Sequence, residues 1–187
     1  DGLAGLVIVH VDTTLLRRCE IPLGQAVPAE PGQIHEVDVL NIGAALQMLK
    51  DGHERFVKGE MVERDLHAQV KATAKGQYPF GVVLGCVDSR VPPEIIFDQG
   101  IGDVFVGRVA GNVEDVNLVG SLEFATKVAG SKVVVILGHT ACGAIKGAAD
   151  GVELGNLTEL LNDFDAPIAR ADEATEGEAS SKNLEFL

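Results

Sequence analysis

Lys132-Val-Val-Val-Ile-Leu-Gly138 is the stretch that decides the fold, because it is the strongest strand signal in the sequence. Two further continuous apolar runs precede it, at residues 80–86 and 103–109. Runs of this length without polar alternation are typical of strands buried on both faces of a parallel sheet. A helical pattern at residues 117–129 separates the second run from the third. Because strands alternate with helices, the expected fold class is α/β, with a parallel-core β-sheet flanked by helices.

Further helices are predicted before and after these runs. Residues 38–58 and 62–75 carry apolar side chains at helical spacing, although Gly52 weakens the first of these helices. A short helix is expected to begin at Pro93, since proline is favoured in the first turn. Another short helix is expected over residues 142–149.

The two ends of the chain differ from its centre. Residues 1–37 are predicted to form an N-terminal arm with a short strand at 6–11, because prolines then break the regular pattern. Residues 38–187 are predicted to form one domain. Within it, residues 150–187 contain 10 acidic and 2 basic residues, and this composition predicts a solvated loop or loose tail.

The overall composition argues against two classes of partner. The 187 residues carry a net charge of −13 with a pI of about 4.7, whereas a nucleic-acid partner requires clustered Lys and Arg. No apolar run approaches the ~20 residues that a membrane-spanning helix needs. The three cysteines are few and odd in number, which is not typical of a disulfide framework. We therefore expect a globular domain without nucleic-acid or membrane partners.

Chemically capable side chains follow two of the predicted strands. The first strand ends at Cys86, and the third is followed by His139 and Cys142. Ligand sites of open parallel sheets lie at the carboxyl ends of strands, so the three side chains are expected within reach of one another. The spacing of His139 and Cys142 places both on one face at the start of a helix, and a helix N-terminus favours the thiolate form of Cys142. Two thiolates and one imidazole suit tetrahedral zinc with an open fourth position, where water can be deprotonated near neutral pH.

Other interpretations of these residues remain open. Asp88 could occupy the fourth position as a metal ligand, or it could pair with Arg90 and accept a hydrogen bond from water. An ordinary loop ion pair is a third possibility for these two residues. A dithiol redox pair competes with the metal site, but it is the weaker reading because the sequence has no Cys-x-x-Cys. A structural zinc module would instead hold the metal with four protein ligands.

The paired motifs resemble those of a known family. The segments Cys86-Val-Asp-Ser-Arg90 and Gly138-His139-Thr-Ala-Cys142-Gly143 together resemble the signature of the bacterial β-carbonic anhydrases. Residues 91–100, Arg108-Val-Ala-Gly-Asn112 and Gly155-Asn-Leu-Thr158 are also similar to bacterial members. The resemblance covers roughly residues 38–186 and implies one catalytic α/β zinc domain.

The resemblance also implies roles for individual residues. Cys86, His139 and Cys142 match the zinc ligands, and Asp88 and Arg90 match the dyad beside the metal. In some relatives the counterpart of Asp88 binds zinc at lower pH, which would make Asp88 a fourth ligand. Gln77 matches a family glutamine that contacts the substrate pocket. The implied cofactor is Zn2+ and the implied reaction is the reversible hydration of carbon dioxide to bicarbonate and a proton.

Assembly, location and chain length are further expectations from the resemblance. Family members are dimers or multiples of dimers with the pocket at the dimer interface, so a homodimer or homotetramer is expected. Bacterial relatives of this style are often exported, which favours the periplasm over the cytoplasm. The family continues further after a segment like Ser181-Lys-Asn183, so the C-terminal part is expected to be shortened. A related zinc hydrolase of carbonyl sulfide or carbon disulfide remains an alternative, because pocket-lining side chains decide the substrate.

Overall fold

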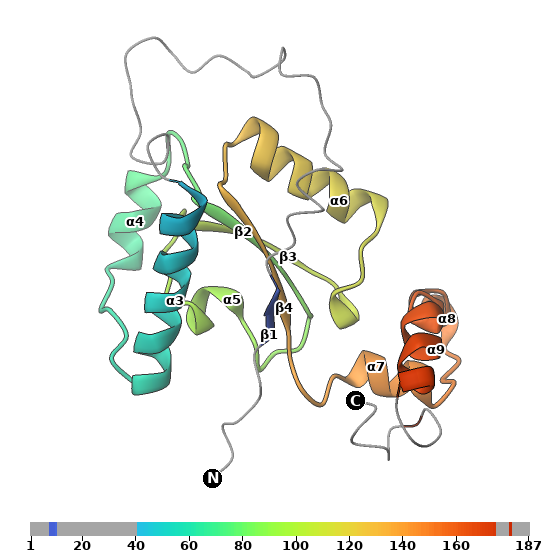
Figure 1. Cartoon of the computed structure of the whole chain (residues 1–187). Coiled ribbons are helices and arrows are strands. Elements are labelled where there is room, and N and C mark those ends of the chain that lie inside the picture. Colours follow the sequence, from blue (N-terminus) through green and yellow to red (C-terminus); the bar gives the residue numbers. More distant parts are fainter. Residues whose placement is uncertain (1–7, 11–40, 175–179, 181–187) are drawn as a thin grey trace.

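The three apolar runs form neighbouring strands of one sheet in the computed structural model, which describes residues 8–10, 41–174 and 180 (Figure 1). The strand order is β1-β4-β2-β3. Strands β2 (Gly81–Gly85), β3 (Val104–Arg108) and β4 (Val133–Gly138) pair in parallel, with β2 in the middle. The predicted α/β class with a parallel-core sheet is confirmed.

The N-terminal strand adds the fourth member of the sheet. Strand β1 (Ile8–His10) pairs antiparallel with β4, which confirms a strand within the predicted range 6–11. The other residues of the predicted arm, 1–7 and 11–37, lie outside the described residues, so the arm itself stays a prediction.

The register of the parallel strands brings their carboxyl ends together. Gly85, the last residue of β2, is paired with Leu137 of β4 on one side and with Arg108 of β3 on the other. The segments that leave these three strands therefore start at one edge of the sheet. This edge carries Cys86 and His139, in agreement with the expectation from the sequence.

Helices cover both faces of the sheet, which explains why the strands are apolar without alternation (Figure 1). On one face, α3 (Ile42–Lys58) and α5 (Pro93–Ile96) pack on Val83, Val133, Val135 and Leu137. On the other, α6 (Val116–Glu123) and its π-helical continuation η2 (Phe124–Val128) pack on Val82, Leu84 and Val134. Successive strand residues point to opposite faces, so each position faces a helical layer. The central strand β2 is buried throughout, whereas the residues of the edge strand β3 are partly buried.

Helix α3 confirms the predicted helix at residues 38–58 from Ile42 onward, while residues 38–40 lie outside the described part of the chain. Asn41 caps it by accepting a hydrogen bond from the amide of Ala44 at 2.9 Å. The glycine that weakens the helical pattern has a packing role. A Cβ atom at Gly52 would lie 1.8 Å from the carbonyl oxygen of Phe97, so only glycine allows α3 to approach the end of α5 this closely.

The second helix is shorter than predicted. Helix α4 covers Leu66–Ala72 instead of residues 62–75, because Asp65 caps it and accepts a hydrogen bond from the amide of Ala68. The preceding residues are engaged elsewhere: the amide of Val62 and the guanidinium of Arg64 both donate to Asp98. These contacts hold the segment before Asp65 outside the helix.

The prediction for the acidic C-terminal region was wrong within the described residues. Residues 155–174 are not a solvated loop; they form α8 (Gly155–Asn162) and α9 (Asp165–Ala174), which follow α7 (Gly143–Ala149). Leu161 and Phe164 are buried. The composition misled because the acidic side chains lie mostly on exposed positions, while a few apolar residues at helical spacing bury one face. None of the helices in the described ranges has the length and apolar character needed to cross a bilayer.

Asp98 is a fully buried carboxylate that joins three segments. It accepts hydrogen bonds from Arg55 Nε of α3 at 2.5 Å, from Arg64 Nη1 and from the Val62 amide at 3.2 Å. Burial by itself raises the pKa of Asp98, but the hydrogen bonds from Arg64, Arg55 and Val62 outweigh burial and hold the pKa at about 2. Its charge is therefore compensated within the fold.

We predict that Asp98→Ala lowers the free energy of unfolding by about 3 kcal/mol, because it leaves two arginines without their buried partner. Urea denaturation measures this loss, and Glu54→Ala is the control. Glu54 forms an exposed ion pair with Lys58, so its removal should cost less than about 0.5 kcal/mol.

The pH dependence gives a second readout of the same carboxylate. Since the pKa of Asp98 is depressed in the fold, its contribution is present above the unfolded pKa of about 3.9 and is lost as the pH falls toward about 2. The stability difference between wild type and Asp98→Asn should shrink over this window. Equal losses of unfolding free energy for Asp98→Ala and Glu54→Ala would contradict the role of Asp98 as a buried, paired carboxylate.

Candidate metal centre

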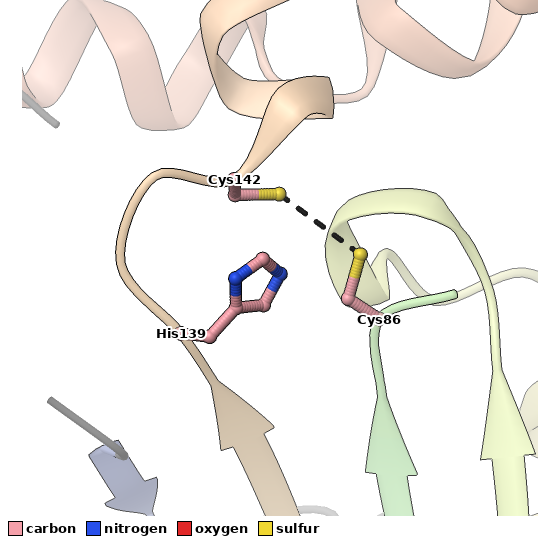
Figure 2. Close-up of side chains that lie close together, drawn as sticks. All are labelled: Cys86, His139 and Cys142. Atoms are coloured by element: carbon pink, nitrogen blue, oxygen red, sulfur yellow. Dashed lines mark hydrogen bonds between the residues drawn. The ribbon is translucent and has the colours of Figure 1, made fainter. Parts of the chain in front are cut away.

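Three side chains from two strand ends converge at the carboxyl edge of the sheet (Figure 2). Cys86 follows β2, while His139 and Cys142 follow β4. One potential ligand atom from each lies within 4.8 Å of the other two, and the two sulfur atoms are 4.0 Å apart. Both cysteines are buried and neither forms a disulfide. These three residues form a group that could hold a metal ion.

A turn, and not a helix face, brings His139 and Cys142 together. Helix α7 begins at Gly143, so His139 lies before the helix and Cys142 is its N-cap residue. Ala141 has φ = 57°, in the left-handed region that non-glycine residues seldom adopt. This conformation turns the chain between the two side chains. The predicted proximity is therefore present, but the predicted geometry of a shared helix face is wrong.

His139 has the hydrogen bonding of a metal ligand. Its Nδ1 lies 3.0 Å from the carbonyl oxygen of Thr140, which can only accept, so Nδ1 carries the proton. The lone pair is then on Nε2, which is buried and has no hydrogen-bond partner in the part of the chain that the structure describes. A buried nitrogen without a partner is costly unless another group fills that role. The donor set fits zinc, for which ligating histidines commonly donate their other nitrogen to a carbonyl.

The two thiols differ in their electrostatic surroundings. Burial raises the pKa of Cys86, but the neighbouring His139 ring and hydrogen bonds from backbone amides outweigh burial, so the pKa is lowered overall. One of these donors is the amide of Gly111, 3.2 Å from the sulfur. For Cys142, burial dominates and the pKa is raised, although the amides of Ile145 and Ala144 act in the opposite direction. The helix N-terminus thus favours the thiolate of Cys142 through these two amides, as expected, but burial outweighs them and the net pKa is raised.

Asp88 and Arg90 form a close pair beside the group. Arg90 donates from Nε to Oδ1 of Asp88 at 2.9 Å and from Nη2 to Oδ2 at 2.6 Å, and its backbone amide also donates to Oδ1. These hydrogen bonds hold the pKa of Asp88 well below its usual range, and the carboxylate in turn raises the pKa of Arg90. Asp88 is thus held ionised.

The carboxylate of Asp88 also faces the histidine. Its Oδ2 atom lies 4.0 Å from Nδ1 of His139. Asp88 is not among the three residues whose ligand atoms gather within 4.8 Å. Its role as a fourth metal ligand stays a prediction, and in this structure its oxygens are engaged by Arg90.

Gln77 lies away from this group. It is exposed in the segment before β2, where it lines a pocket of about 510 Å3 with Thr73 and Lys75. Cys86 follows the opposite end of β2, and five strand residues alone span about 17 Å. Within one chain, Gln77 therefore does not reach the cysteines, and its role in a substrate pocket stays a prediction.

Two residues that contact the loop carrying Cys86 and Asp88 were not predicted from the sequence as site residues. Arg108 donates to the carbonyl oxygens of Cys86 and Asp88, and the amide of Gly111 donates to the Cys86 sulfur. Both belong to the segment Arg108-Val-Ala-Gly-Asn112, directly after the neighbouring strand β3. Their place at the same edge of the sheet was the signal available in the sequence.

We predict that the purified protein binds about one zinc ion per chain and that Cys142→Ser weakens zinc binding by more than about 100-fold, because it replaces a thiolate ligand. Competition with a chromophoric chelator measures the affinity. Cys19→Ser, which removes the third cysteine of the sequence and leaves Cys86 and Cys142 in place, is the matched control and should bind zinc as the wild type does. Unchanged zinc affinity in Cys142→Ser would remove Cys142 from the ligand set.

Comparison with known proteins gives a consistent set of similarities. Residues 81–186 match the family described as carbonic anhydrase. Carbonic anhydrase 2 of Mycobacterium tuberculosis is 46% identical over 115 residues, which cover 61% of this chain and 56% of that protein. A carbonic anhydrase of Mycolicibacterium smegmatis is 44% identical over 115 residues with the same coverage. The chain thus spans little more than half the length of these curated relatives.

Solved structures show the same fold. A tetrameric β-carbonic anhydrase of Sordaria macrospora superposes with a TM-score of 0.52 at 34% identity, over 58% of this chain and 59% of that one. A β-carbonic anhydrase of Coccomyxa in complex with acetazolamide gives a TM-score of 0.53 at 21% identity, over 79% and 68% of the two chains. At that identity the second similarity concerns the fold alone.

Proposed function

The chain belongs to the β-carbonic anhydrase family, and we propose that it catalyses the zinc-dependent, reversible hydration of carbon dioxide to bicarbonate and a proton. One observation carries the proposal: the buried Nε2 of His139, which has no partner among the described residues, lies beside two buried thiols and next to the Asp88–Arg90 pair. A structural site would need a fourth protein ligand, whereas the carboxylate of Asp88 beside the group is engaged by Arg90.

The ligand set supports zinc as the cofactor. Cys86, His139 and Cys142 supply two sulfur donors and one nitrogen donor, a combination found in catalytic zinc sites. The chemistry that zinc supplies in such a site is Lewis acidity, which makes water a nucleophile near neutral pH. Three protein ligands leave room for a small exchangeable molecule.

Asp88 and Arg90 orient the water in this proposal. The carboxylate of Asp88 accepts a hydrogen bond from the attacking water, which directs the lone pair of the water toward carbon dioxide. Arg90 keeps the carboxylate ionised and holds its plane with two hydrogen bonds. A contact from Arg90 Nη2 to the carbonyl oxygen of Ala141, at 3.5 Å, links this pair to the turn that carries Cys142.

We also propose that the active form is a homodimer or a larger homo-oligomer. Strand β3 is an edge of the sheet in the described ranges, and beside it lies a pocket of about 550 Å3. The pocket is lined mainly by apolar side chains, among them Met61, Leu66, Ile95 and Ile101, all of which are exposed in the single chain. A second copy at this edge would cover them, and it would allow Gln77 to serve the site of the partner.

We predict carbon dioxide hydration by the zinc-loaded protein, measured by stopped flow with a pH indicator. Arg90→Ala should lower kcat/KM by about 100-fold, because the carboxylate of Asp88 loses the partner that orients it. Arg170→Ala, which removes the same charge from an exposed position of α9, is the control and should retain wild-type rates.

Two outcomes would contradict this functional assignment. Unchanged turnover in Arg90→Ala would show that the pair has no part in the reaction. One zinc per chain without hydration activity would favour a structural zinc module or a hydrolase of carbonyl sulfide or carbon disulfide. Assays of the same protein with these two substrates distinguish the hydrolase from the structural module.

We predict that Ile95→Glu shifts the protein toward monomers, because it places a charge in the apolar pocket beside β3. Light scattering coupled to size-exclusion chromatography measures the mass. Val57→Glu changes an exposed apolar residue of α3 that does not line this pocket and should leave the mass unchanged. Equal masses for wild type and Ile95→Glu would argue against an interface at this edge.

A further inference from the structure

Arg108 donates two hydrogen bonds to the backbone of the loop that carries Cys86 and Asp88. Its Nε donates to the carbonyl oxygen of Cys86 at 2.8 Å, and its Nη2 donates to the carbonyl oxygen of Asp88 at 2.5 Å. The two donors lie on one edge of the planar guanidinium, so they fix the relative orientation of two carbonyl groups. Both carbonyls belong to residues whose side chains face the metal group.

The loop between β2 and Arg90 is also held by backbone hydrogen bonds, in addition to the bond from the Gly111 amide to the Cys86 sulfur. The amide of Val87 donates to the carbonyl oxygen of Val109 at 3.3 Å, which extends the ladder between β2 and β3 by one residue. The carbonyl oxygen of Asp88 also accepts from the amide of Val91 at 3.2 Å. Arg108 is the side chain that connects the residues Cys86 and Asp88 to each other through one rigid group.

The side chains of Cys86 and Asp88 have different partners at the site. The sulfur of Cys86 lies toward Cys142, while the carboxylate of Asp88 lies toward Arg90. Two residues apart on a short loop, their directions follow from the backbone orientation at both positions. A small rotation of either peptide would move a sulfur or a carboxylate relative to the group.

We propose that Arg108 is a positioning residue: by holding the carbonyls of Cys86 and Asp88, it sets the sulfur of Cys86 toward His139 and Cys142 while it keeps the carboxylate of Asp88 on Arg90. Its effect on the metal rests on the function proposed above. Its effect on the loop concerns the chain alone and exists in the metal-free protein.

The first test is the alkylation of the metal-free protein by iodoacetamide, with the rate at each cysteine followed by peptide mass spectrometry. Arg108→Met keeps the apolar stem and removes the donors. It should raise the rate at the buried Cys86 by about tenfold or more and that at Cys142 by less than about twofold, because only the loop of Cys86 is released. Arg170→Met, the matched loss of an exposed arginine, should change neither rate.

General destabilisation predicts a different pattern, in which both cysteines react faster to the same extent. That result, or wild-type rates at Cys86 in Arg108→Met, would overturn the proposal. Arg108→Lys retains donors at this position without the rigid fork, so its rate at Cys86 should lie between those of wild type and Arg108→Met. Loss of this order would also count against the proposal.

The second test is the transfer of zinc from the loaded protein to a chromophoric chelator. Residues that orient metal ligands typically change metal affinity by about 10- to 100-fold, so Arg108→Met should release zinc at least about tenfold faster than wild type. An unchanged release rate would overturn the link to the metal. Carbon dioxide hydration by the wild type tests the proposed function separately, because the alkylation rates do not depend on turnover.

Discussion

The parallel pairing of β2 with both β3 and β4 is the constraint on which the rest of the structure depends. Because β2 is paired on both sides in register, three chain segments leave the sheet at one edge. The first brings Cys86 and Asp88, the second brings Arg108 and Gly111, and the third brings His139 and Cys142. A slip by one residue in either pairing would turn every side chain of that strand to the other face and separate these groups.

Much of this arrangement could be predicted from the sequence, because strands that are covered on both faces consist of continuous apolar runs. The continuous apolar runs reflect the two helical layers, and the alternation of strands with helices reflects the crossovers. The proximity of Cys86, His139 and Cys142 follows from the same reasoning, since parallel strands end at one edge. Local pattern and topology agree in this central part of the chain.

The parts that could not be predicted depend on contacts between distant residues. The start of α4 is set by Asp98, which lies more than thirty positions away from Val62 and Arg64 and engages both. The raised pKa of Cys142 comes from burial and from Cys86, which the position at a helix N-terminus does not reveal. The acidic composition of the C-terminal region concealed two helices, because charge averaged over a segment does not show which face is apolar.

The contact between Phe164 and Gly111 connects the C-terminal helices to the segment that follows strand β3. A Cβ atom at Gly111 would lie 2.2 Å from Cζ of the Phe164 ring, so the ring presses directly on the residue whose amide faces the Cys86 sulfur. Any shorter version of this chain, whether made by proteolysis or by choosing expression boundaries, must therefore keep α8 and the ring that follows it. A boundary placed after α7, which the acidic composition alone would suggest as harmless, would remove the support behind Gly111 and leave its peptide free to turn away from the thiol.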